Sequence, residues 1–209
     1  MIQGTTNRTV AAIVLAAGES RRMGGTNKLA LDIGGEALLH RTVRTLQAST
    51  LSDLVVVLGH EADAARSLLD GLDVRTVVNE AYAQGQMTSV HRGLEALTRP
   101  CDGVMICLSD QPLLTSGDID FLIDAFAARP DAAILVPVHR GQRGNPIILA
   151  STQREAILAG GRNLGCKHLI DRNPELVTTI EAPSDHFVFD LDTPADYDSL
   201  QRQGAGGVF

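Results

Sequence analysis

The chain has 209 residues, of which 44% are hydrophobic and 21% are charged, and its formal net charge is −7. This length and composition are typical of a globular protein with a substantial core, so we interpret residues 1–209 as a single domain. The acidic balance argues against a general nucleic-acid binder and against a membrane-surface binder, because either would need a basic face.

The compartment is predicted from three further features. The first nine residues lack the apolar segment of a signal peptide, and no apolar run approaches the length of a membrane span. The chain has three cysteines, an odd number without CxxC spacing, so we expect neither a disulfide framework nor a structural zinc site. These features predict a cytoplasmic protein. The cysteines are Cys101, Cys107 and Cys166.

Short apolar runs alternate with amphipathic stretches along most of the chain, which is typical of βαβ units. We therefore expect a three-layer, Rossmann-like α/β fold with a mostly parallel sheet and helices on both faces. The run at 145–149 closely follows another strand, and predicts a hairpin-like or mixed part of the sheet. Strands are expected at 11–15, 54–58, 74–78, 104–108, 133–138, 146–149 and 177–180. Helices are expected near 38–48, 62–69, 87–97, 116–128, 152–158 and 166–172, and from 194 onward.

The first apolar run ends in a loop of small residues and cations. Small residues let a ligand approach the backbone, and successive free N–H groups bind anions. Arg22 and Lys28 would supply the positive charge that a polyphosphate needs. Neither a Walker loop nor the Gly-x-Gly-x-x-Gly fingerprint occurs here, and an ordinary turn with solvated arginines is the alternative. The string reads Leu15-Ala16-Ala17-Gly18, followed by Arg22-Met23-Gly24 and Lys28.

Asp110 follows the apolar run 104–108, in the string Leu-Ser-Asp-Gln-Pro. A carboxylate just beyond a buried parallel strand lies where such sheets present their ligand-binding groups. Magnesium prefers one or two carboxylates together with phosphate oxygens and water, so Asp110 is a candidate ligand for a magnesium–nucleotide complex. The alternative is an aspartate that merely begins a turn.

These strings resemble the MobA-like nucleotidyltransferases, and within them the molybdenum cofactor cytidylyltransferases. The resemblance extends from Val14 to Tyr197. It implies a fold like that of the nucleotide-diphospho-sugar transferases, with the nucleotide in the N-terminal half and the acceptor in the C-terminal half. The implied reaction transfers CMP from CTP to the terminal phosphate of molybdenum-molybdopterin and releases pyrophosphate, with Mg²⁺ as cofactor. A molybdoenzyme or its chaperone is the implied protein partner.

The resemblance also implies roles for individual residues. A late acidic string would provide a second metal ligand, for which Asp192 is our candidate and Asp190 the alternative. Capping of a helix by Thr193 or Asp192, with Pro194 in its first turn and Asp196 at its positive end, explains part of that string without any function. The implied catalytic residues are Arg22, Lys28 and Asp110, and the implied metal ligands are Asp110 and Asp192. The implied nucleotide-binding residues are Leu15, Ala16, Ala17, Gly18, Arg22, Lys28, Asn79, Ser89 and Asp110.

The acceptor side matches the family less closely. Asn145 lies in a Gly-Asn-Pro string like that of the family, although this string also makes a turn by itself. Lys167 stands where the family usually has arginine, and the aspartate of the same family string is absent. Asn145 and Lys167 are the predicted acceptor-binding residues, and the departure puts the identity of the acceptor in doubt more than the reaction.

Four alternatives to this function remain open at the level of sequence. The enzyme could use GTP, although the methyl group of Ala17 narrows the pocket beside the base and favours a pyrimidine. It could use a sugar phosphate as acceptor. The chain could be a nucleotide-binding accessory protein without turnover. It could also be an oxidoreductase, against which the missing dinucleotide fingerprint argues.

Overall fold

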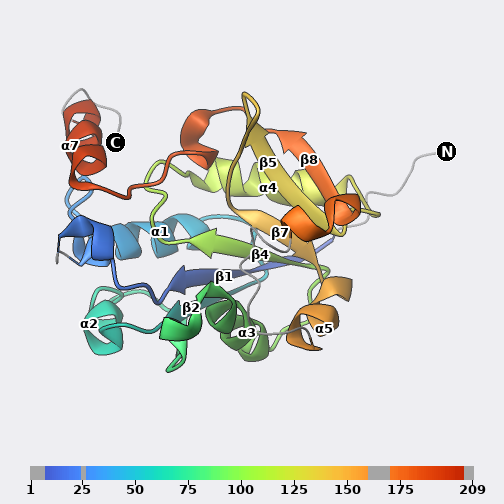
Figure 1. Cartoon of the computed structure of the whole chain (residues 1–209), viewed down its shortest axis with the longest axis horizontal. Helices are drawn as coiled ribbons and strands as arrows, with labels where there is room; N and C mark the ends of the chain where they lie inside the picture. The colour runs from blue at the N-terminus through green and yellow to red at the C-terminus, as the bar shows by residue number, and fades with distance from the viewer. Residues whose placement is uncertain (1–7, 25–26, 160–169, 205–209) are drawn as a thin grey trace.

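The structure is a computed structural model and describes residues 8–24, 27–159 and 170–204. Within these residues, eight strands form one mixed sheet in the order β3-β2-β1-β4-β7-β5-β6, and β8 pairs with β5 (Figure 1). The α/β fold predicted from the sequence is therefore confirmed. The strands are β1 Val10–Ala16, β2 Asp53–Leu58, β3 Arg75–Val78, β4 Gly103–Leu108, β5 Ile134–His139, β6 Gln142–Arg143, β7 Ile147–Ala150 and β8 Val177–Glu181.

Helices cover both faces of this sheet. In Figure 1, α1 and α4 lie above β1 and β4, and α3 and α5 lie below these two strands. The α-helices are α1 Leu38–Gln47, α2 Ala62–Ser67, α3 Gln86–Ala96, α4 Ser116–Ala127, α5 Thr152–Ala159 and α7 Pro194–Gly204. Short 3-10 helices are η1 Arg21–Met23, η2 Lys28–Ala30, η3 Tyr82–Gln84, η4 Pro174–Leu176 and η5 Asp185–Phe187.

The central strand β1 is buried along its whole length because both of its faces are covered. Successive side chains of a strand point to opposite faces, so β1 supplies two separate hydrophobic clusters. Val14 belongs to the cluster shared with α1 and α4, whereas Ile13 belongs to the cluster shared with α3 and α5. Gly93 of α3 lies against Ile13, where a β-carbon would collide with that side chain. The missing side chain lets α3 pack close to the sheet.

The sheet is parallel on one side and mixed on the other. β1 pairs in parallel with β2 and β4, and β2 with β3. β7 runs antiparallel to both β4 and β5, which confirms the mixed part of the sheet predicted for 145–149. The short strand β6 was not predicted, and α2 ends two residues before its predicted end. Residues 170–172 are helical, and the rest of the helix expected at 166–172 lies outside the described residues.

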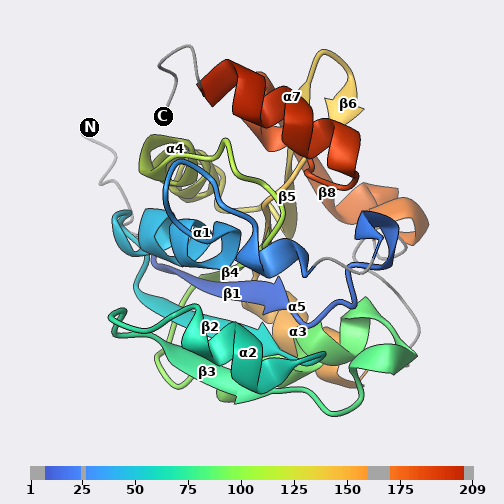
Figure 2. The same cartoon turned by 90° about the vertical axis from the view of Figure 1, so that its left-hand side faces the viewer.

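The last described helix returns to the beginning of the fold. Tyr197 Oη and Gln201 Nε2 donate hydrogen bonds to the carbonyl oxygen of Asp32, at 3.0 and 2.7 Å. Leu191 and Leu200 pack in a third hydrophobic cluster with Met23, Ile33 and Leu38. Figures 1 and 2 show α7 beside the loop that follows β1. This packing brings the acidic string near the end of the chain next to the loop near its beginning.

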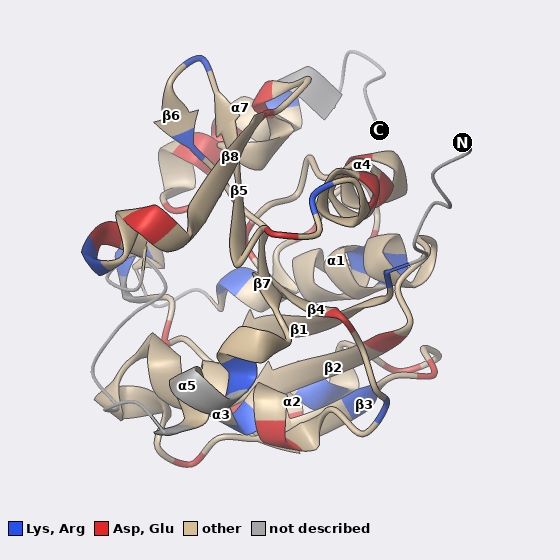
Figure 3. Ribbon diagram, turned by 90° about the vertical axis from the view of Figure 1, so that its right-hand side faces the viewer, with Lys and Arg blue, Asp and Glu red and all other residues tan. Residues whose placement is uncertain are grey.

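Charges of both signs are interspersed on the side of the molecule that Figure 3 presents. Positive and negative segments occur there on both helices and loops, with no large region of a single sign. Among the described helices, none has the length and apolar character needed to cross a bilayer. On this side of the molecule, concentrations of charge are therefore local.

Candidate functional site

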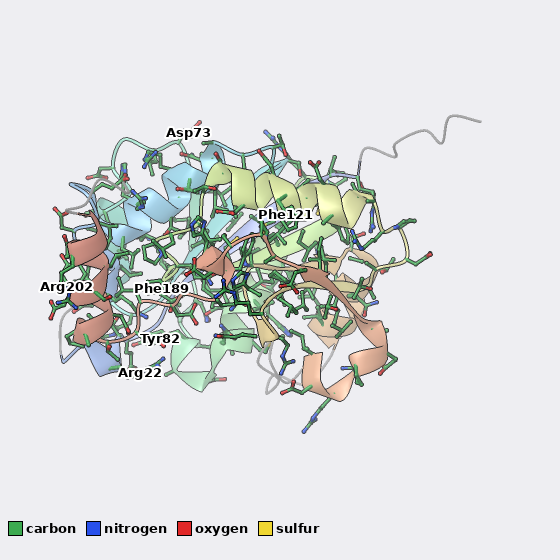
Figure 4. The ribbon with its side chains drawn as sticks, turned by 90° about the horizontal axis from the view of Figure 1, so that it is seen from above. Arg22, Asp73, Tyr82, Phe121, Phe189 and Arg202 are labelled. Carbon is green, nitrogen blue, oxygen red and sulfur yellow. The ribbon has the colours of Figure 1, made fainter. Side chains whose placement is uncertain are left out.

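A cavity of about 600 Å³ opens at the carboxyl ends of β1 and β4. Its walls come from the loop after β1, the end of β4, the 82–89 segment and the acidic string near 190–192. Figure 4 labels two of the lining residues, Arg22 and Tyr82, at the left-hand end of the view. Parallel sheets bind ligands at this edge, so the cavity lies where the sequence predicts a binding site.

Lys28 lies at the centre of an ion-pair network inside this cavity. Its Nζ atom is 3.0 Å from Asp110 Oδ2 and 3.1 Å from Asp192 Oδ1. Arg22 Nη1 lies 2.7 Å from Asp192 Oδ2. The side chain of Lys28 is 13% exposed, whereas that of Arg22 is 72% exposed. An exposed pair contributes little stability, so Arg22 can exchange its carboxylate for a phosphate at small cost.

Asp190 adds a third carboxylate to the cavity. Burial raises the pKa of Asp190 to about 6, and the charges of Asp110 and Asp192 add to this shift. Lys28 opposes it, because a nearby positive charge favours the ionised carboxylate. Three carboxylates are thus gathered around one partly buried ammonium group, and an additional cation would relieve their mutual repulsion.

The donor set fits a hard divalent cation of the magnesium type. Asp110 Oδ1 is buried and has no hydrogen-bond partner among the described residues, so a lone pair there is available to a ligand. No group of three or more His, Cys, Asp and Glu side chains poised around a metal occurs in the described part of the chain. Asp110 and Asp192 both face Lys28 Nζ, and two carboxylates suit a metal that is also held by phosphate oxygens and water, as magnesium usually is.

Most of the predicted nucleotide-binding residues meet in this one cavity. Gly18, after β1, lies among them, and Ser109 Oγ donates to the carbonyl oxygen of Leu15 at 3.0 Å, which joins the ends of β1 and β4. Ala16 is an exception, because it is buried in β1 and does not line the cavity. The predicted residues that line the cavity are Leu15, Ala17, Gly18, Arg22, Lys28, Ser89, Asp110 and Asp192.

Asn79 is buried behind the cavity wall and is not one of its lining residues. Its Nδ2 donates to Thr88 Oγ1 at 2.8 Å and to Ser89 Oγ at 2.9 Å. Its Oδ1 accepts from the backbone N–H of Ala81 at 3.0 Å. Both amide hydrogens are therefore used by hydroxyl groups at the beginning of α3, and one of these hydrogen bonds holds the Ser89 side chain in place. A direct contact between Asn79 and a nucleotide remains a prediction that the placement does not favour.

Of the two predicted acceptor-binding residues, Asn145 does not line the cavity. Asn145 precedes a cis peptide bond to Pro146, and its backbone N–H donates to the carbonyl oxygen of Phe187 at 2.8 Å. Lys167 lies outside the described residues. Both roles therefore remain predictions.

Tyr82 and Ser109 are among the lining residues that the sequence did not predict. Tyr82 lies in η3, between the predicted residues Asn79 and Ser89, and its hydroxyl lies 3.4 Å from His60 Nδ1. Ser109 directly precedes Asp110. The available signal was the position of Ser109 beside Asp110 and of Tyr82 between Asn79 and Ser89, but neither residue type points to a ligand by itself.

Gly59 separates two walls of the cavity, and its replacement provides a test of their spacing. A β-carbon at this position would lie 2.7 Å from Ala17 Cβ and 2.9 Å from Tyr82 Cβ. In Gly59→Ala we expect a loss of about 1–3 kcal/mol in the free energy of unfolding, because overpacking forces the backbone to shift. Nucleotide affinity should fall with it, because Ala17 and Tyr82 both line the cavity.

Chemical denaturation and calorimetric titration with nucleotide would measure both effects. Gly117→Ala in α4 is the matched control, because a β-carbon there would meet only Thr115 Oγ1, at 3.7 Å. An alanine at position 59 that leaves stability and nucleotide affinity unchanged would show that the two walls do not depend on this close approach.

Comparisons with known proteins find relatives that align with more than half of this chain. The 2-C-methyl-D-erythritol 4-phosphate cytidylyltransferase of Symbiobacterium thermophilum is 34% identical over 130 residues, 62% of this chain and 55% of that protein. Purine catabolism protein PucB of Bacillus subtilis is 30% identical over 202 residues, 91% of this chain and 95% of that protein. Nicotine blue oxidoreductase of Paenarthrobacter nicotinovorans is 25% identical over 189 residues, 88% of this chain and 92% of that protein.

The relatives differ in length as well as in name. The chain spans about half of the cytidylyltransferase and 28% of the bifunctional protein GlmU of Sinorhizobium medicae, which is 30% identical over 130 residues, 61% of this chain. The name of any one relative is therefore no measure of the activity of this chain.

Solved structures share the whole fold. The Rv0371c homologue of Mycobacterium sp. strain JC1 superposes with a TM-score of 0.78 at 29% identity, over 94% of this chain and 97% of that one. Rv0371c of Mycobacterium tuberculosis in complex with manganese gives a TM-score of 0.69 at 22% identity, over 93% of this chain and 98% of that one, and shows the fold alone. Residues 12–176 match the MobA-like NTP transferase domain, and the chain belongs to that family.

Proposed function

We propose that this protein is a nucleotidyltransferase that moves CMP from CTP to the terminal phosphate of molybdenum-molybdopterin. The observation that carries the proposal is the meeting of two cations and two carboxylates in one cavity, where Arg22 and Lys28 face Asp110 and Asp192. A triphosphate needs cations to neutralise it, and a nucleotide-bound metal ion needs carboxylates. The cavity supplies both beside a loop of small residues.

The proposed reaction proceeds by in-line displacement. An oxygen of the acceptor phosphate forms a bond to the α-phosphorus of CTP, the bond from that phosphorus to the bridging oxygen breaks, and pyrophosphate leaves. The acceptor oxygen is already anionic, so no general base is required. When Mg²⁺ is bound by Asp110 and Asp192, it supplies charge neutralisation for the phosphate oxygens.

The chain's own side chains would contribute by position and charge. Lys28 and Arg22 would release their carboxylates and bind the triphosphate, where they would stabilise the charge that develops on the leaving pyrophosphate. Gly18 and its neighbours would let the phosphates approach the backbone of the loop. Holding both reactants in line contributes much of the rate in such reactions.

The choice of CTP is supported by the cytidylyltransferase relative and by the methyl group of Ala17 in the cavity wall. GTP and a sugar phosphate are the alternatives within the same reaction class, because the relatives' names refer to different substrates. We expect the product to pass to a molybdoenzyme or its chaperone in the cytoplasm.

Pyrophosphate release with each nucleoside triphosphate in turn tests the proposal. The reactions contain Mg²⁺, with and without molybdenum-loaded pterin. Release with CTP only when the pterin is present supports the proposal, whereas release with GTP keeps the reaction class and overturns the base. Oxidation of NAD(P)H in the absence of any nucleoside triphosphate would instead support the oxidoreductase that the name of one relative suggests.

A further inference from the structure

Cations already hold three of the four carboxylate oxygens of Asp110 and Asp192. Lys28 Nζ lies 3.0 Å from Asp110 Oδ2 and 3.1 Å from Asp192 Oδ1. Arg22 Nη1 donates a hydrogen bond to Asp192 Oδ2 at 2.7 Å. The fourth oxygen, Asp110 Oδ1, is buried and has no hydrogen-bond partner among the described residues. A divalent cation that approaches this arrangement therefore meets a single uncommitted oxygen.

The ammonium group of Lys28 and a divalent metal ion exclude each other on these oxygens. Two cations within about 4 Å repel each other, and the repulsion is stronger away from bulk water. The Lys28 side chain is only 13% exposed, and the carboxylates that it bridges are also partly buried, so solvent screens the repulsion incompletely. Lys28 thus occupies the position between the two carboxylates that a shared metal ion would take.

The backbone around Lys28 is held in place, whereas its side chain is flexible. The backbone N–H of Lys28 donates to Ser20 Oγ at 3.3 Å, and that of Leu29 donates to Asn27 Oδ1 at 3.0 Å. Lysine carries its charge at the end of a flexible four-carbon stem, so the ammonium group can change partner while the loop stays where it is. Lys28 and Arg22 both line the cavity, and a triphosphate bound there would offer both of them new anionic partners.

We propose that Lys28 is an internal competitor of the metal ion, whose ammonium group keeps divalent cations off Asp110 and Asp192 until a nucleoside triphosphate draws it away. Triphosphate and metal then bind with positive coupling, and each raises the affinity for the other by the same factor. The site takes up its metal together with the nucleotide and not before it. The inference rests on the proposed function, because it describes the regulation of the same site.

Mn²⁺ binding in the absence of any nucleotide tests this competition, with free Mn²⁺ measured by electron paramagnetic resonance. In Lys28→Met we expect the dissociation constant for Mn²⁺ to fall about 10–100-fold, within the usual range of coupling between two ligands. The affinity of the same variant for CTP without metal should also fall, because the ammonium group that would bind the triphosphate is gone. Opposite changes in the two affinities distinguish competition from a structural role, which would not tighten metal binding.

Two controls and a second variant accompany this measurement. Lys28→Arg keeps a cation at the position and should keep the weak metal binding of the wild type. Arg66→Met also removes a cation that lies 2.6 Å from a carboxylate, but that carboxylate, Asp63, is exposed on α2, so Mn²⁺ affinity should equal that of the wild type. Arg22→Met releases only Asp192 Oδ2 from an exposed partner, and should lower the Mn²⁺ dissociation constant by about 2–5-fold.

Unchanged or weaker Mn²⁺ binding in folded Lys28→Met would overturn the inference. If Lys28→Met does not fold, unchanged Mn²⁺ binding in Arg22→Met would overturn it instead. The measurement contains neither CTP nor pterin, so its result does not depend on which nucleotide and acceptor the protein uses. Tighter Mn²⁺ binding by Lys28→Met, together with a wild type that transfers no CMP to the pterin, supports the competition and overturns the proposed acceptor alone.

Discussion

Asp110→Asn is expected to lower the rate of CTP-dependent pyrophosphate release about 10²–10³-fold, the usual effect of removing one preorganised charge-stabilising group. The substitution keeps the size of the side chain but removes the charge that faces Lys28 Nζ at 3.0 Å and the free lone pair of Oδ1. A neutral amide binds Mg²⁺ far more weakly than a carboxylate, so the metal-bound triphosphate would lose its anchor on β4.

The fold should survive this substitution, because the backbone contact between Asp110 and Leu191 does not involve the side chain. Asp120→Asn is the control: Asp120 Oδ1 accepts hydrogen bonds from the backbone N–H and Oγ1 of Thr50 at an exposed site away from the cavity. Steady-state rates and circular dichroism on both variants would measure activity and folding. Wild-type turnover in folded Asp110→Asn would contradict the metal role.

Lys28→Met is expected to reduce turnover by a similar factor, about 10²–10³-fold, because it removes a positive charge from the site rather than a negative one. The methionine removes the ammonium group that would neutralise the triphosphate, and it leaves Asp110, Asp190 and Asp192 without their central cation. The pKa of Asp190 should then rise further above its present value of about 6, because Lys28 now lowers it. Weaker binding of CTP should accompany the loss of rate.

Lys28→Arg keeps the charge and should recover part of the activity, whereas a purely steric role would show no such recovery. Arg99→Met controls for the loss of a cation elsewhere, because Arg99 donates to the carbonyl oxygen of Ser52 on an exposed surface. Steady-state kinetics and calorimetric CTP titration would separate rate from affinity. Unchanged kcat/KM in Lys28→Met would show that this cation takes no part in transfer.

The parts of the fold with a strong local signal could be predicted from the sequence. The run 11–15 was identified as a strand because a strand covered on both faces is apolar at every position. The hairpin-like departure near 145–149 was also visible, because too few residues separate the two runs for a crossover. The two-residue strand β6 is too short to carry a pattern, and so it was missed.

The candidate site was predictable where its residues lie next to a strand end, as with Gly18 and Asp110. Which late aspartate faces Lys28 could not be predicted, because it depends on α7 packing against the loop around Asp32, more than 160 positions away. The placement of Asn79 behind the wall depends in the same way on its contacts with Thr88 and Ser89. The orientation of such side chains depends on packing between segments far apart in the sequence, and a local sequence pattern does not predict that packing.

The product formed from CTP and molybdenum-loaded pterin tests the central claim most directly. Purified protein with Mg²⁺ should convert the two substrates to a cytosine dinucleotide and pyrophosphate in equal amounts, measured by mass spectrometry and a coupled pyrophosphate assay. The dinucleotide should be missing when Asp110→Asn replaces the wild type. CTP that stays intact beside folded wild-type protein and pterin, or pyrophosphate released without any dinucleotide, would contradict the account.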